Sequence, residues 1–202
     1  MEKEKYIIDL DEIRKMMSRS SRFISLSGLS GVSTGFIALA GALLARQLVF
    51  RHHDYLVYEA VPIDADNLSN LLLVALGTLL LSVFSALWFT GRKSRKENRC
   101  AWDNQAKRLL TNLLIPLLAG GILCLILLLR GYVGFLPGLT LIFYGLALLN
   151  GSHFTLSHIR LLGIADIVLG LFAFLFIEQS LFLWMLGFGV LQSIYGLLIQ
   201  WK

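Results

Sequence analysis

Long apolar runs alternate with short polar segments along almost the whole chain, and this pattern predicts helices that cross a membrane. A bilayer core about 30 Å thick requires roughly 20 apolar residues in each helix. Six runs meet or approach that length. They are Phe23–Arg46, Asn67–Thr90, Leu109–Leu129, Tyr132–Asn150, His158–Ile177 and Leu181–Gln200. We therefore expect an all-α integral membrane protein, in which residues 23–202 form one domain of six transmembrane helices.

The segment before the first run, residues 1–22, has a different pattern. Asp9, followed three residues later by Glu12, has the form of a capping box, and an apolar stripe begins at Leu10. We expect a cytoplasmic amphipathic helix on the membrane surface, with a helix that docks a cytoplasmic protein as the alternative. Because the first run follows a charged segment of 22 residues and is too long for a signal-peptide core, it should remain as an anchor.

Two loops differ in charge, and the difference predicts the orientation. The loop 91–108 carries seven Lys or Arg and two acids, whereas residues 47–66 carry one Arg and four acids. Lys and Arg collect in cytoplasmic loops, so the 91–108 loop and both termini should lie inside and loop 47–66 outside. Arg130 is the exception, because it lies at the outer end of the third run. We expect a multi-pass protein of the bacterial inner membrane that contacts anionic lipid at its cytoplasmic face.

Glycine spacing predicts how the helices pack. Three runs carry small or polar residues at i, i+3 and i+7, a spacing that keeps them on one helix face. These triplets are Gly28, Gly31 and Gly35; Gly163, Asp166 and Gly170; and Gly189, Gln192 and Gly196. Such faces let helix backbones approach closely. We expect the last two helices to approach each other through their glycines, and a homo-oligomer formed through glycine faces is a further expectation.

A repeat is visible in the second half of the chain. GLTLIFYGL at residues 138–146 recurs as GVLQSIYGL at residues 189–197, an offset of 51. Together with the triplet of the first run, this similarity predicts three helical hairpins that are parallel repeats of one unit.

The same segments carry a resemblance to known proteins. FLPGLTLIFYGLALLNGSHFTLSHIRLLGIADIVLGL, the later GFGVLQSIYG and the N-terminal SRSSRFISLSGLSGV are similar to a family of uncharacterised bacterial inner-membrane proteins. The glycine-rich hairpin unit also resembles, more distantly, the HdeD-type acid-resistance membrane proteins. The resemblance implies a six-helix membrane fold and brings no catalytic residues with it.

Asp166 is the sharpest candidate for chemistry. It lies about 12 Å along its helix at 1.5 Å per residue, where an ionisable group costs a few kcal/mol. It should therefore face the bundle interior. Folding the last hairpin at Gln179 puts Asp166 and Gln192 at the same depth, so we expect them to contact each other. A carboxylate that takes a proton or a ligand is one interpretation, and a polar contact that joins two helices is the other.

Other candidates have simpler explanations. At the inner rim, His153, His158 and Arg160 could hold an anion or a lipid phosphate, although a solvated turn explains them equally well. Ser30 lies in a Gly-Leu-Ser-Gly segment like that of intramembrane proteases, but no histidine lies at comparable depth to act as its base. The outer histidines, His52 and His53, lack a third ligand at a recognised spacing. We assign no catalytic residue and no metal ligand.

Composition then excludes several function classes. Hydrophobic residues make up 56% of the chain and charged residues 15%, against roughly 25% charged in soluble domains. The net charge of +5 is explained by the cytoplasmic loop, so we expect no nucleic-acid partner. No motif indicates an enzyme or a cofactor. We expect a non-enzymatic protein, with membrane homeostasis or a stress response as its role, acting through lipid or protein partners. The alternative is a small transporter or channel that uses Asp166 and Gln192, and a lipid-modifying enzyme at the inner rim is a third.

Overall fold

The structure is a computed structural model that describes residues 28–50, 55–96, 104–152 and 158–201. Every element in these ranges is helical. The long helices are α2 (Gly28–Leu48), α3 (Ala65–Lys96), α4 (Asn104–Leu129), α5 (Leu136–Ser152) and α6 (His158–Leu175), and the 3-10 turns are η1 (Val133–Phe135) and η2 (Ile177–Gln179). The last run is divided into α7 (Ser180–Trp184), a π-helix η3 (Met185–Leu191) and α8 (Gln192–Gln200). The amphipathic helix expected over residues 1–22 lies outside the described residues.

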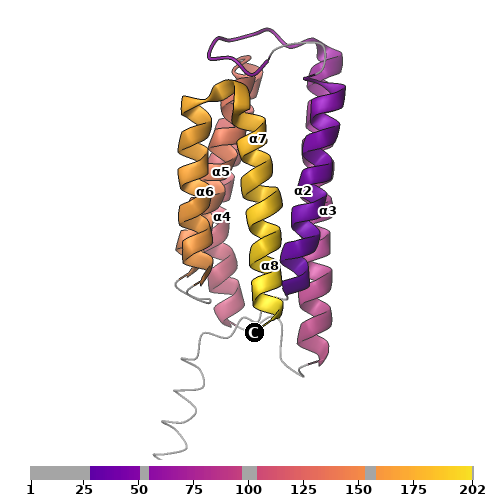
Figure 1. The fold of residues 1–202 in the computed structure, drawn as a ribbon, viewed down its shortest axis with the longest axis vertical. Helices are drawn as coiled ribbons and strands as arrows, with labels where there is room; N and C mark the ends of the chain where they lie inside the picture. Colours follow the sequence, from indigo (N-terminus) through magenta and orange to yellow (C-terminus); the bar gives the residue numbers. More distant parts are fainter. Residues whose placement is uncertain (1–27, 51–54, 97–103, 153–157, 202) are drawn as a thin grey trace, which may run out of the picture.

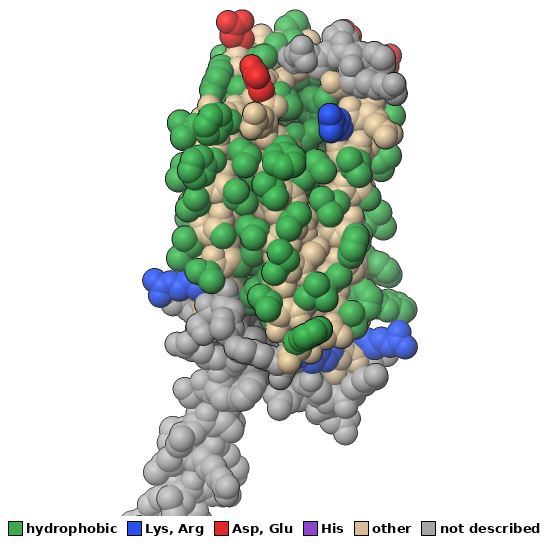
Figure 2. Space-filling model, in the orientation of Figure 1, with side chains coloured by type: hydrophobic (Ala, Val, Ile, Leu, Met, Phe, Trp, Pro, Cys, Tyr) green, Lys and Arg blue, Asp and Glu red, His purple; other side chains and the backbone are tan. Residues whose placement is uncertain are grey.

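The chain has the character of a multi-pass membrane protein. Within the described ranges, five helical stretches are long and apolar enough to cross a membrane. They are Gly28–Leu48, Ala65–Lys93, Leu109–Leu129, Val133–Ser152 and Ile177–Gln200. The fifth predicted run forms α6, which has 18 residues and packs along α5. Figure 2 shows a broad surface of hydrophobic side chains between the charged ends of the molecule, as expected for a surface that faces lipid.

The extensive contacts between the described helices follow a sequence in which α3 and α4 come first and last, and at one end of the bundle α3 also packs against a cluster that includes Leu128 of α4. Among the described elements, α3 packs extensively only on α2, which packs in turn on α8 and η3. On the other side, α4 packs on α5, and α5 packs on α6. Helix α7 contacts both α5 and α6 and so joins the two sides (Figure 1). The bundle therefore consists of two packed groups, α2–α3–α8 and α4–α5–α6, that meet along α7 and η3.

Glycines bring α2 and α8 into backbone contact. A Cβ on Gly196 would lie 2.5 Å from the carbonyl oxygen of Gly28, and a Cβ on Gly35 would lie 2.7 Å from that of Gly189. A Cβ on Gly31 would lie 3.0 Å from the Cα atom of Gly196. A side chain at any of these glycine positions would overlap the facing helix, so the antiparallel crossing depends on glycine.

A second glycine crossing joins α5 and α6. A Cβ on Gly163 would lie 2.8 Å from the carbonyl oxygen of Gly145, and a Cβ on Gly170 would lie 2.8 Å from that of Gly138. The expectation that the last two helices approach each other through their glycines is therefore wrong. A glycine stripe packs closest against another backbone that is also free of side chains, and α5 and α2 offer such stripes.

The two ends of the bundle differ in charge. The start of α2, the end of α8 and the facing ends of α3 and α4 lie at one end (Figure 1). The exposed basic residues Arg92, Lys107 and Arg160 and the half-buried Lys93 lie there. The other end, which we call the loop end, holds residues 55–64 and the η2 turn. Its exposed acids are Glu59, Asp64, Asp66 and Glu178. Two exposed arginines, Arg46 and Arg130, also lie at this end.

Candidate functional site: a buried polar cluster around Asp166

Asp166 lies inside the bundle, on the face of α6 that looks toward the π-helix. Its side chain is only 1% exposed. Its Oδ1 atom is 3.1 Å from the position that a Cβ on Gly187 would occupy. The absence of a side chain at Gly187 is thus what leaves room for the carboxyl group between α6 and η3.

Gln192 forms a hydrogen bond with Tyr144, and no hydrogen bond joins it to Asp166. The Nε2 atom of Gln192 donates a hydrogen bond of 2.9 Å to the hydroxyl oxygen of Tyr144 on α5. Asp166 makes no hydrogen bond to Gln192 or to any other described residue. The expectation assumed two regular α-helices on either side of the turn. The π-helix between the turn and Gln192 changes the number of residues per turn and shifts which residue faces Asp166.

The cluster is rich in hydrogen-bond acceptors that lack a partner. Among the described residues, both carboxyl oxygens of Asp166, Oε1 of Gln192 and the hydroxyl of Tyr195 are buried without a hydrogen bond. Tyr144 lies within electrostatic range of both Asp166 and Tyr195, so it connects the members of the cluster. Buried polar atoms in folded proteins are normally paired, and each exception requires an explanation. A carboxylate in such a place must hold a proton, or meet a cation, a water or a polar ligand.

Aromatic side chains pack beside this cluster. Phe188 of η3 lies between Tyr144 and Trp184, with ring centroids 4.7 Å and 4.8 Å away. The Nε1 atom of Trp184 donates a 2.9 Å hydrogen bond to the hydroxyl oxygen of Thr140 on α5. The rings hold η3 and α7 against α5, and they cover one side of the polar cluster with apolar surface.

The sequence interpretation missed three members of the site: Tyr144, Tyr195 and Gly187. A signal for the two tyrosines was present, because they occupy the same position in the repeated segments 138–146 and 189–197. The π-helix that carries Gly187 left no such signal, since its residues, Met185–Leu191, read as a continuous apolar helix.

The remaining candidates fall outside this site. His153, His52 and His53 lie outside the described residues, and the side chain of His158 is not described. Arg160 is exposed near the start of α6, so the inner-rim cluster remains a prediction. Ser30 is buried on α2 between the glycines that face α8. Within the described ranges, no group of three His, Cys, Asp or Glu side chains could hold a metal ion.

Comparisons of the chain with protein-family models, with curated proteins and with solved structures give no match. The function must therefore be argued from the cluster and its surroundings.

Proposed function

We propose that the chain is a non-enzymatic, multi-pass protein of the bacterial inner membrane in which Asp166 reversibly binds a proton or a small cation. The observation that supports this proposal is the carboxyl group itself, which is 1% exposed and has no hydrogen-bond partner for either oxygen among the described residues. Ionisable residues inside membrane segments are expensive and usually mark a functional site. A purely structural aspartate would be expected to donate or accept a hydrogen bond across the helix interface.

The proposed topology has six spans, as three parallel hairpins, with both termini in the cytoplasm. The distribution of charge supports it, since four basic residues and none of the exposed acids named above lie at the end that holds the α8 terminus, whereas four exposed acids and two arginines lie at the loop end. In this arrangement the protein acts through lipid or protein partners, in the manner of a stress-related or membrane-homeostasis factor. The resemblance to HdeD-type proteins favours a response to acid, to which a proton site would be suited.

A small transporter or channel is the second candidate. Gln192 Oε1 and the Tyr195 hydroxyl favour it, because they add buried, unpaired neutral oxygen atoms near Tyr144, which also lies within electrostatic range of Asp166. Small hard cations prefer such oxygen atoms. Proton or cation flux through liposomes that contain the purified protein would separate this candidate from a site that only binds.

The first test of the proposal is the thermal stability of purified wild-type and Asp166→Asn protein across pH. With no partner for its carboxylate, the folded protein resists ionisation of Asp166, whereas the unfolded chain ionises freely. Stability of the wild type should therefore fall as the pH rises above about 4, the usual pKa of an aspartate in an unfolded chain. Asparagine removes the titration, so the variant should be more stable than the wild type at the alkaline end. Asp66→Asn is the matched control, because Asp66 is exposed at the start of α3, and it should not change the pH profile.

The opposite outcome is equally clear. If Asp166→Asn lowers the melting temperature by the same amount at every pH, Asp166 is a structural hydrogen-bonding group and the proposal is wrong.

A further inference from the structure

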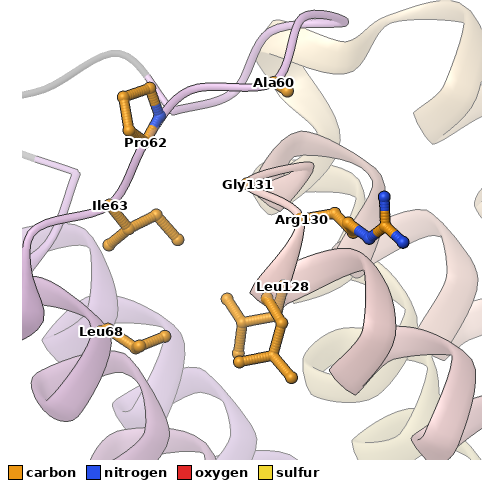
Figure 3. A pocket seen from close by; sticks show the side chains of 8 residues that line it. Ala60, Pro62, Ile63, Leu68, Leu128, Arg130 and Gly131 are labelled. Atoms are coloured by element: carbon orange, nitrogen blue, oxygen red, sulfur yellow. The ribbon is translucent and has the colours of Figure 1, made fainter.

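A pocket lies at the loop end of the bundle, away from the Asp166 cluster. Its volume is about 410 Å³, within the range of small-molecule sites. Pro62 and Ile63 of the loop and Leu68 of α3 form one side, and Leu128, Leu129 and Arg130 at the end of α4 form the other. Figure 3 shows Ile63 and Leu68 facing Leu128 across the space, while the Arg130 side chain extends from the α4 side, away from Ile63 and Leu68.

Fixed contacts hold this pocket in shape. The backbone N–H of Val61 donates a 3.1 Å hydrogen bond to the carbonyl of Gly131. Gly131 has a φ of 83°, and a Cβ there would lie 2.7 Å from the carbonyl oxygen of Val61, so glycine is required at this contact. Further along the loop, the Tyr58 hydroxyl donates to the carbonyl of Phe174 or Leu175, each 2.9 Å away. The loop is thereby fastened to the ends of both α4 and α6.

The pocket combines an apolar slot with one cation. Ile63 and Leu68 pack against a buried cluster that includes Leu128, so the slot continues into the core. Leu129 is 69% exposed and is the last residue of the apolar length of α4, which places it on the surface that faces lipid. Arg130 is the next residue, and it is exposed. It therefore lies at the level where hydrocarbon ends and lipid headgroups begin.

We propose that this pocket binds one phospholipid molecule from the surrounding leaflet. The phosphate contacts the guanidinium of Arg130, and one acyl chain lies in the slot lined by Ile63, Leu68 and Leu128. The charge argues for this occupant, because a guanidinium pairs well with phosphate oxygens. The position of the pocket also argues for it. A phospholipid places its phosphate on the headgroup side of the hydrocarbon boundary, where Arg130 lies, and its acyl chains on the hydrocarbon side, where Leu129 lies.

Native mass spectrometry of the full chain in detergent, with defined lipids added, tests this site. The probe is dioleoyl phosphatidylglycerol, and dioleoylglycerol serves as the same pair of chains without a phosphate. The wild type should hold one phosphatidylglycerol more tightly than further copies, and Arg130→Gln should weaken that first binding about tenfold, a loss of about 1.4 kcal/mol. Arg130→Lys should retain part of the affinity. Arg46→Gln is the matched control, since Arg46 is an exposed arginine at the same end but outside the pocket, and it should leave the affinity unchanged.

Several outcomes would overturn the proposal. Equal weakening by Arg130→Gln and Arg46→Gln would show that lipid binds through general surface charge. Equal affinity for dioleoylglycerol would leave only an apolar slot with no role for the arginine. Displacement of the bound lipid by inorganic phosphate alone would make the site one for free phosphate. A spectrum dominated by dimers that Arg130→Gln abolishes would assign the surface to a second copy of the chain.

Discussion

Substituting Gly196 with alanine should force α2 and α8 apart. The added methyl group would lie 2.5 Å from the carbonyl oxygen of Gly28 and 2.6 Å from the amide nitrogen of Val32. Ordinary van der Waals contact begins at about 3.4 Å, so the two helices would have to separate by almost 1 Å. Both obstructing atoms belong to the backbone, and no rotation of a side chain can relieve the overlap.

The cost can be isolated with a second glycine. Gly77 lies on α3, and a Cβ at that position would meet nothing within 4 Å. Alanine is favoured over glycine in a helix by about 1 kcal/mol, and this gain applies to both substitutions. The difference between the two variants is therefore the overpacking cost alone, about 1 to 3 kcal/mol in a well-packed interior.

The assay is reversible unfolding in mixed micelles, with the free energy of unfolding compared for the wild type, Gly196→Ala and Gly77→Ala. Gly77→Ala should be as stable as the wild type or more stable, and Gly196→Ala should be less stable than Gly77→Ala by the stated margin. A difference below about 0.5 kcal/mol, the usual size of a surface effect, would refute the close approach of α2 and α8.

Two further predictions concern individual hydrogen bonds. Tyr58→Phe removes the hydroxyl that ties the loop to the end of α6, so it should cost about 1 kcal/mol and expose residues 55–64 to faster cleavage by added protease. Gln192→Leu removes the donor to Tyr144 and should lower the free energy of unfolding by about 1 to 3 kcal/mol. Gln200→Leu, at an exposed position near the end of α8, should change it by less than about 0.5 kcal/mol.

The hydrophobic pattern predicted the helices well, because a membrane imposes a minimum length that few other structures share. The run Leu109–Leu129 ends at the same residue as α4, and the fifth run begins at the same residue as α6. The pattern could not predict the neighbours of each helix. In lipid, the surface facing another helix and the surface facing acyl chains are both apolar, so hydropathy does not distinguish them. The pairing depends on which glycine stripes meet, and that is a property of the folded chain.

The candidate site was predicted only in part, for a related reason. Asp166 stands out in the sequence because a charged residue in an apolar run is rare. Tyr144 and Tyr195 do not stand out, because tyrosine is common in membrane helices and only its buried neighbours make it part of a polar cluster. The π-helix that sets Gly187 against Asp166 depends on packing between η3 and its neighbours. The local sequence of Met185–Leu191 does not reveal this packing.

The position of the cluster bears on how proton binding would act. Glycine crossings join α2 to α8 and α5 to α6 at backbone distance, so each pair is rigid and resists separation. Between the pairs, α8 has no extensive backbone contact with α5 or α6, and the Gln192–Tyr144 hydrogen bond spans the gap. Asp166 lies at this junction, opposite the π-helix. Under the proposed function, a proton gained or lost there would change the contact between the two pairs and leave both rigid pairs intact.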